Sequence, residues 1–477
     1  MRNSKLIQIL QTFDGKQRRA FEDFVASPFF NKQVELVQYY GYLKKIAAKG
    51  FPTNKLARKE LFLQIWPHQA YDEKQLNYLS SQLLKLAERF IGISKFEQAG
   101  ILPDCYQLQY CIDHRLEKHY QYGMKAAAKK VEHGKKDSEQ YFYQQYLLAD
   151  LREKHFSSLK QRRYDEGLQE AADYLDQYYL FKKLYHLCAM LDRQNVVTPS
   201  YAPHFMNEIQ AMLHQLPFDS PAIRTLEQLL LSLKHPSKAD HFTQLREYLR
   251  QYSDHFSAAM LRDLYFSIIN FCIRKIRYGE KAYATALMSI YQEGIQKEVL
   301  FEDGYLSPWT FKNLVKLGIG LKEYNWTESF IADYAPKLPP HMQQDALHFN
   351  LADLYYALQD YPKAQLHLRQ VEFSDVQYSF GAKLTLIKIY FETDQEEALQ
   401  SLLSSFKIFL QRKKLITKDV KMPYLNFIQL VHKLYKANVE QLNSLQAEIQ
   451  KTEMLTARSW LLQQLQQRID RPKTSYN

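Results

Sequence analysis

A five-residue pattern in the C-terminal half recurs at the spacing expected for one pair of helices. Asp360-Tyr-Pro-Lys-Ala364 returns 34 residues later as Asp394-Gln-Glu-Glu-Ala398, and Tyr356 and Tyr390 keep the same spacing. A third copy is indicated by Asn325-Trp326-Thr-Glu-Ser329, 35 residues before Asp360. In such a unit the alanine lets two antiparallel helices approach, the tyrosine fills the wedge between them, and the aspartate caps the second helix. The period therefore predicts stacked helix pairs.

The composition agrees with long helices joined by short connections. The 477 residues include only 14 Gly and 16 Pro, about half the usual share. Apolar residues recur at spacings of three and four, and the clearest stripe consists of Leu76, Leu79, Leu83, Leu86 and Phe90. No sustained period-two alternation bounded by turn residues is present, so strands are not expected. We predict an all-α fold.

The repeated segment resembles the tetratricopeptide repeat over roughly residues 310–412. With Asp345 as the first position, four residues of the best copy match the family pattern, namely Leu351, Ala352, Tyr355 and Ala364. His348 replaces the usual aromatic residue, and Leu368 and Val371 replace small residues of the second helix. Over the whole chain, an N-terminal SPFFN element followed by degenerate repeats resembles a group of uncharacterised bacterial helical-repeat proteins.

The resemblance implies a right-handed superhelical array of antiparallel helix pairs, an α-solenoid, with a small N-terminal helical cap. We expect four regions: an N-terminal helical cap domain (1–100), irregular helical hairpins (101–300), tetratricopeptide-like repeats (301–436), and a C-terminal capping helix and tail (437–477). The apolar side chains around Phe29 are expected to be buried together in the first region. In the last region Leu442, Leu445, Ile449, Leu461, Leu465 and Ile469 are expected to close the array, and a coiled-coil dimer is the alternative.

The first helix of each pair lines the concave face of tetratricopeptide arrays. On that resemblance, the residues that would bind a partner are Phe349, Asn350, Asp353 and Tyr356 in one repeat and Lys383 and Tyr390 in the next. Some members of the family bind the C-terminal carboxylate of a peptide with Lys and Asn at fixed groove positions. Phe349 and Asp353 occupy these positions here, so this clamp is absent. A mixed aromatic and polar groove suits an extended peptide or a helix. The alternative is that these residues only pack against neighbouring repeats.

A stripe of basic residues carries the main alternative function. The formal charge is +11 and the isoelectric point is about 9.1. One helix face is expected to present Arg115, Lys118, Tyr122, Lys125, Lys129 and Lys136. Regularly spaced cations can follow a phosphate backbone, so this face could bind nucleic acid. The alternative is a solvated helix face.

The sequence contains no familiar catalytic or cofactor motif. GxSxG, GxxxxGK[ST] and GxGxxG are all absent. The four cysteines form no CxxC pair, and Cys111 with His114 would need two further ligands to hold a metal. We therefore expect no enzyme activity, no cofactor and no metal site. No run of about 18 apolar residues is present, so we expect no membrane span. The overall expectation is a cytoplasmic binding scaffold for a protein or peptide, either monomeric or dimeric.

Overall fold

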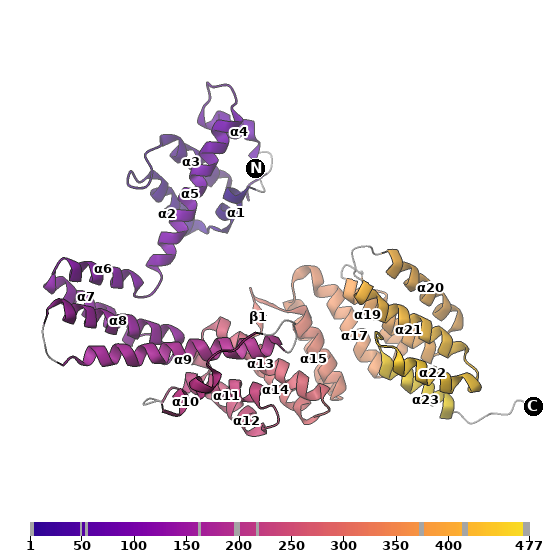
Figure 1. Cartoon of the computed structure of the whole chain (residues 1–477). Helices are drawn as coiled ribbons and strands as arrows, with labels where there is room; N and C mark the ends of the chain where they lie inside the picture. The colour runs from indigo at the N-terminus through magenta and orange to yellow at the C-terminus, as the bar shows by residue number, and fades with distance from the viewer. Residues whose placement is uncertain are drawn as a thin grey trace, which may run out of the picture. The chain divides into compact units, whose positions relative to one another are not determined.

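The computed structural model confirms that the chain is all-α (Figure 1). It describes residues 4–47, 50–52, 56–160, 164–194, 201–215, 219–371, 376–412 and 418–470. In these ranges the only strands are β1 (Phe301–Glu302) and β2 (Tyr305–Leu306), which pair antiparallel with Phe301 opposite Leu306. None of the helices in these ranges is both long and apolar enough to cross a membrane.

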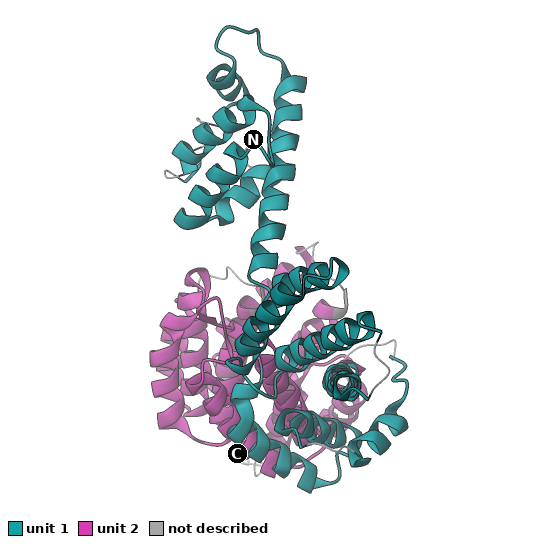
Figure 2. Cartoon of the chain, turned by 90° about the vertical axis from the view of Figure 1, so that its left-hand side faces the viewer, with its two compact units in different colours: residues 1–190, 201–256 teal, residues 191–200, 257–477 magenta. Residues whose placement is uncertain are grey.

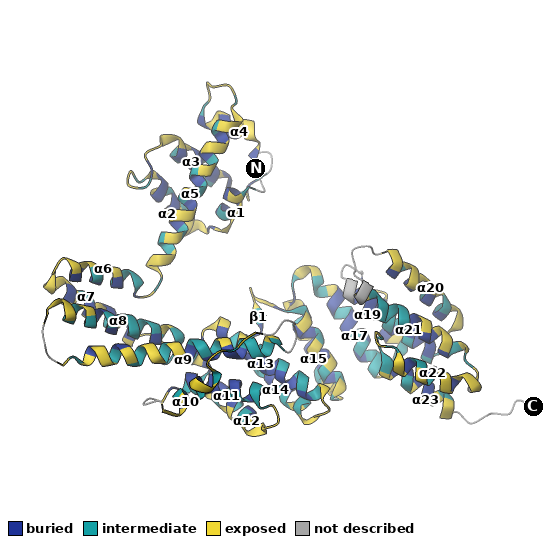
Figure 3. Cartoon of the chain, in the orientation of Figure 1, coloured by how far each residue is buried: buried dark blue, intermediate teal, exposed yellow. Residues whose placement is uncertain are grey.

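The chain divides into two compact units, which Figure 2 shows in different colours. The first unit contains residues 1–190 and 201–256, and the second contains residues 191–200 and 257–477. Within each unit several consecutive helices pack against each other, for example α11 with α12 in the first and α17 with α18 in the second. Their buried residues face these neighbours, and exposed residues cover the opposite side of each helix (Figure 3).

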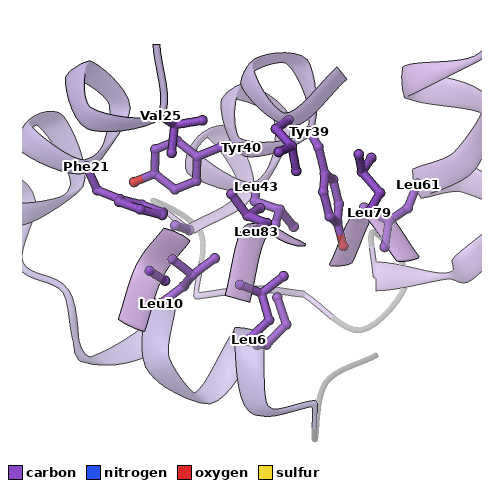
Figure 4. Close-up of a cluster of buried hydrophobic side chains, with 14 of the residues drawn as sticks. Leu6, Leu10, Phe21, Val25, Tyr39, Tyr40, Leu43, Leu61, Leu79 and Leu83 are labelled. Atoms are coloured by element: carbon purple, nitrogen blue, oxygen red, sulfur yellow. The ribbon is translucent and has the colours of Figure 1, made fainter. Parts of the chain in front are cut away.

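The first unit begins with five helices around one apolar core. These are α1 (Lys5–Thr12), α2 (Gly15–Ala26), α3 (Val34–Ala47), α4 (Arg58–Ile65) and α5 (Glu73–Glu97). Phe21, Tyr40, Leu43 and Leu83 meet in the core (Figure 4), and the ring centroids of Phe21 and Tyr40 are 4.6 Å apart. Burial of each large apolar side chain stabilises the fold by roughly 1.5–3 kcal/mol. The Tyr40 hydroxyl donates to the carbonyl of Arg18 (2.9 Å), so its polar end is satisfied.

The SPFFN segment differs from the expectation in one residue. Phe30 stacks on Phe24 at 4.0 Å, but Phe29 is 82% exposed. Asn31 stabilises the loop, since its Nδ2 donates to the carbonyls of Val25 (2.8 Å) and Gln33 (2.9 Å), and α3 begins at Val34. These bonds fix the loop backbone and direct consecutive phenylalanines to different surroundings.

The rest of the first unit consists of helical hairpins of unequal length. Its helices are α6 (Leu102–Asp113), α7 (Glu117–Glu132), α8 (Glu139–Ser158), α9 (Glu166–Gln194), α10 (Met206–Gln215), α11 (Pro221–Lys234) and α12 (Ala239–Tyr252), followed by the 3-10 turn η2 (Ser253–His255). The last residues of α9 belong to the second unit.

The second unit contains the sequence repeat. Its α-helices are α13 (Ala258–Arg277), α14 (Ala282–Gln296), α15 (Pro308–Gly320), α16 (Tyr324–Tyr334), α17 (Gln343–Ala357), α18 (Tyr361–Leu368), α19 (Val376–Glu392), α20 (Glu396–Arg412), α21 (Lys418–Lys436), α22 (Val439–Lys451) and α23 (Arg458–Asp470). The 3-10 turns η3 (Ala335–Lys337) and η4 (Pro340–Met342) lie between α16 and α17. The expected capping segment is two helices, α22 and α23, and Leu442, Leu445, Ile449, Leu461 and Leu465 are buried within the unit, whereas Ile469 is exposed.

Three turns of the second unit share one geometry. Lys322, Gln359 and Asp394 have φ values of 62°, 62° and 53°. After each of them a backbone N–H bonds the carbonyl five residues earlier, from Glu323 to Gly318, Asp360 to Tyr355, and Gln395 to Tyr390. This is the hydrogen bond of a helix that ends at a left-handed residue.

The shared turn corrects the register assigned from the sequence. Asp360 does cap α18, because its side chain accepts from the N–H of Lys363 (3.2 Å). Its structural counterpart is Gln395, however, and Asp394 occupies the left-handed position before it. The two hairpins are therefore offset by 35 residues in place of 34, and Asn325 lies inside α16.

Candidate functional site

The first helices of three consecutive pairs carry equivalent residues on one face. Residues at i, i+4 and i+7 of a helix lie on the same side. This spacing relates Lys312, Lys316 and Ile319 on α15, and it relates Phe349, Asp353 and Tyr356 on α17. On α19 the corresponding pair is Leu384 and Lys388, each 35 residues after its α17 counterpart. Because α17 packs against both α15 and α19, the three faces converge.

The converging residues line a cavity of about 390 Å³. The remaining lining residues are Ala357, Gly381, Tyr424 and Thr456. Lys316 is exposed, whereas Lys312, Asp353 and Lys388 are half-buried. The cavity is thus large enough for a small ligand or one side chain of a partner and is lined by aromatic rings and by charged groups.

One wall of the cavity depends on a glycine. Phe349 is 3% exposed, and a Cβ atom at position 381 would come within 2.6 Å of its ring. Gly381 therefore allows the Phe349 ring to lie directly against α19. Lys312 Nζ lies 5.0 Å from the centre of the same ring, within the range of a cation–π interaction.

The charges of the cavity are perturbed by burial. Burial raises the pKa of Asp353, opposed by Lys316, Lys312 and Lys388, and Thr385 Oγ1 donates to its Oδ1 (3.2 Å). Burial likewise lowers the pKa of Lys388, although Asp353 and Glu392 favour its charged form. Clefts that hold such perturbed groups are candidates for binding sites.

A carboxylate next to the cavity connects it to the C-terminal helix. Glu392 accepts hydrogen bonds from the hydroxyls of Tyr356 (2.7 Å) and Tyr361 (2.8 Å) and from Trp460 Nε1 (2.5 Å). Burial, followed by the bond to Glu392, raises the pKa of Tyr356. Trp460 belongs to α23, so this network links the last helix to α17 and α19 and holds the Tyr356 ring at the cavity.

The six groove residues expected from the sequence have different surroundings. Phe349, Asp353 and Tyr356 line the cavity, but Asn350 is fully buried and its Nδ2 donates to the carbonyl of Ala346 (2.7 Å). Lys383 Nζ lies 5.3 Å from the centre of the Phe409 ring, and Tyr390 packs against the core of the C-terminal helices. Neither of these last two residues lines the cavity.

The sequence reasoning missed the three lysines of the cavity. A spacing of 34 was applied where the structural offset is 35, so Lys383 was taken as the counterpart of Phe349 in place of Leu384, and Lys388, the counterpart of Asp353, was not identified. The sequence reasoning also did not extend the pattern to α15, where Lys312 and Lys316 lie. Alignment of the repeats by their helix ends, and not by the Asp and Ala of the motif, would have identified Lys388 on α19 and the two lysines on α15.

The expected basic face is divided by a turn. Arg115 has a φ of 55° and lies between α6 and α7, and Lys136 follows the end of α7. The remaining four residues lie on one face of α7, namely Lys118, Tyr122, Lys125 and Lys129. All six are exposed, Tyr122 to 81%. Within the described ranges, Lys118, Lys125 and Lys129 form no ion pair.

Cys111 and His114, the two residues considered as metal ligands, have different surroundings. Cys111 is buried, and His114 is exposed, with its ring stacked on Tyr110 at 4.0 Å. Among the residues that the structure describes, no group of three or more His, Cys, Asp or Glu side chains is arranged to hold a metal.

The architecture and the cavity define an all-helical protein built from packed helical hairpins. Comparison with protein-family models, curated proteins and solved structures finds no match to this chain.

Proposed function

We propose that the chain is a non-enzymatic binding scaffold, and that α15–α20 form a tetratricopeptide-like array whose inner face binds a protein or peptide. The observation that carries this proposal is the cavity built from the first helices of three consecutive pairs. Lys316, Asp353 and Lys388 take equivalent positions on those helices and all reach the same cavity. Asp353 and Lys388 are half-buried, and side chains that served packing alone would not need charge there, since burial of charge is unfavourable.

A charge reversal on the inner face tests the scaffold. The full-length chain is used as bait with host lysate, and the captured proteins are quantified for the wild type and for Lys316→Glu. Lys316 is exposed, so the reversal should leave the fold intact. The matched control is Lys407→Glu, an exposed lysine on α20 outside the cavity. We expect at least one protein that the wild type and Lys407→Glu capture equally and Lys316→Glu does not. Identical sets from all three baits would contradict the proposal.

The helix-pair geometry has a separate test. Ala364 is 0% exposed on α18, which packs against α17. Ala364→Trp should reduce the free energy of unfolding by about 1–3 kcal/mol or more, because a packed helix contact has no room for the indole. Denaturation followed by circular dichroism measures this change. A melting temperature equal to that of the wild type would show that Ala364 is not at a close helix contact.

The exposed face of α7 supports a second candidate function, nucleic-acid binding. Three lysines without ion pairs in the described ranges surround an exposed tyrosine, and a base could stack on that ring. Anisotropy titrations with a single-stranded oligonucleotide at two salt concentrations test it. We expect affinity to fall steeply as salt rises, and each Lys→Gln change on this face should reduce the slope by about 1. Absence of binding at low salt would remove this candidate.

A further inference from the structure

We propose that the cavity between α15, α17 and α19 binds a phosphate monoester in its dianionic form. This inference rests on the proposed function, since it names the chemical group that a ligand of the inner face presents. Three cations and one anion line the cavity, Lys312, Lys316, Lys388 and Asp353. The described lining therefore carries two more positive charges than negative charges when all four groups are ionised.

The size of this excess favours a dianion over a carboxylate. A phosphate monoester carries a charge of about −1.5 to −2 at neutral pH, so it can balance the excess, whereas one carboxylate balances only half of it. All three cations are lysines, and lysine presents a compact point charge with three donors, which can bind the oxygens of a phosphoryl group.

The position of the charges strengthens the attraction. Lys388 is half-buried between helices, and its Nζ lies 5.6 Å from the centre of the Tyr356 ring. Water screens a charge less in such a place, so the same ion pair is several times stronger than on an open surface. Burial also disfavours the charged form of Lys388. An arriving dianion would restore the favourable environment that this ammonium loses.

The other walls indicate what the phosphoryl group is attached to. Phe349, Tyr356 and Tyr424 contribute aromatic rings, and Ile319 and Leu384 contribute aliphatic side chains. The volume of about 390 Å³ lies in the lower part of the range of small-ligand sites. A phosphate ester of a flat ring fits both features. A phosphotyrosine side chain and a nucleoside monophosphate share this chemistry.

Two probes of equal shape test the dianion. Calorimetric titration of the full-length chain with phenyl phosphate is compared with titration with phenyl sulfate, which carries a single negative charge. We expect phenyl phosphate to bind at least about tenfold more tightly, because its second negative charge interacts with the lysines in a partly desolvated space. Equal affinities, or no binding of phenyl phosphate at millimolar concentration, would overturn the proposal.

Three substitutions locate the binding at this cavity. Lys316→Gln and Lys388→Gln should each weaken phenyl phosphate binding about tenfold. Asp353→Asn should strengthen it, because the competing carboxylate is removed while its shape is kept. Lys407→Gln, on the exposed side of α20, should change nothing. Circular dichroism confirms the fold of each variant. Equal weakening by Lys316→Gln and Lys407→Gln, or weakening by Asp353→Asn, would place the binding elsewhere and overturn the proposal.

Two further probes separate the sources of the ester and keep this inference distinct from the scaffold. Tighter binding of a peptide with a central phosphotyrosine supports a phosphorylated protein partner, and tighter binding of adenosine 5′-monophosphate supports a free nucleotide. If no phosphate ester binds but Lys316→Glu still loses a partner, the scaffold stands and the phosphate inference fails. If esters bind and no captured protein depends on Lys316, the inference stands and the protein scaffold fails.

Discussion

Two sets of lysines show how the same residue type acquires different properties in the two units. On α7 of the first unit, Lys118, Lys125 and Lys129 lie on the open face of one helix. In the second unit, Lys316 and Lys388 come from different helices and line one cavity. Water screens the charges of the first set, so each contributes little beyond solubility and long-range attraction. The second set shares a partly desolvated space, where charges interact strongly and recognition of a particular group becomes feasible.

The comparison extends to the aromatic residues beside the lysines, where we expect the largest effect. Phe349→Ala should reduce the free energy of unfolding by about 3–5 kcal/mol, because a buried ring is lost and a cavity remains. Tyr122→Ala on the exposed face of α7 should change it by no more than about 0.5 kcal/mol. Urea denaturation followed by circular dichroism measures both. Similar losses in the two variants would mean that Tyr122 is packed and the α7 face is not open.

The next largest difference in stability is expected for substitutions of two glycines, one in each unit. A Cβ at position 381 would meet the Phe349 ring, whereas a Cβ at Gly92 of α5 has no described atom within 4 Å. Gly381→Ala should destabilise the second unit by about 1–3 kcal/mol. Gly92→Ala should stabilise the first unit by about 0.5–1 kcal/mol through better helix propensity. Thermal melts of the two variants test the signs. Stabilisation by Gly381→Ala would show that Phe349 does not need the glycine.

A histidine pair predicts a pH dependence of the second unit. The Nδ1 atoms of His348 and His367 lie 3.0 Å apart, and the His367 ring stacks on Tyr355. Burial lowers the pKa of both rings, and His348 lowers that of His367 further, while Asp345 opposes the shift for His348. The unfolded chain therefore binds more protons near the usual value of 6.5, so stability should be lost as pH falls below it.

His367→Gln measures that contribution. Melting temperatures of the wild type and the variant are compared at pH 7.5 and pH 5. The wild type should lose more on acidification, since only it must protonate two adjacent rings or keep them neutral. The matched control is His432→Gln on α21, an exposed histidine outside the pair. An equal loss in wild type and His367→Gln would contradict a role for the pair.

The smallest expected effect concerns the lysines themselves. Because burial lowers the pKa of Lys388, its charged form opposes folding at neutral pH, and this opposition is lost as pH rises through the lowered pKa towards the usual value of 10.5. Lys388→Met should therefore raise the melting temperature slightly at pH 7. Lys125→Met on α7 should leave it unchanged, because that side chain is already in water. A fall in melting temperature for Lys388→Met would show that the ammonium is stabilised by its neighbours.

The sequence pattern predicted the class of fold because it depends on short-range features. Leu76, Leu79 and Leu83 share one face of α5 through helical spacing alone, and all three are buried. Asp360 caps α18 through a bond to a residue three positions away, Lys363. Leu442, Leu445 and Ile449 follow helical spacing in the same way and are buried on α22. Such features need no knowledge of distant residues.

The site itself was predicted only in part. Phe349, Asp353 and Tyr356 were identified from one repeat, but the register of the next repeat was displaced by one residue. One residue turns a helix by about 100°, so this displacement replaced Lys388 by a residue on another face. The break between α6 and α7 was missed as well, because the turn around Arg115 contains neither glycine nor proline. There the left-handed residue is held by a bond from the N–H of Leu116 to the carbonyl of Cys111 (2.8 Å).

The amino-acid sequence by itself determined that the chain forms helices and where most of their apolar faces lie. Periodicity, capping and turn chemistry depend on residues that are only a few positions apart, so they can be recognised directly in the sequence. Tertiary structure decided which lysines meet Asp353 and which remain in water, because the distance between helices depends on contacts such as Phe349 against Gly381. Charged side chains can bind a ligand group strongly only where separate helices bring them into one partly desolvated space.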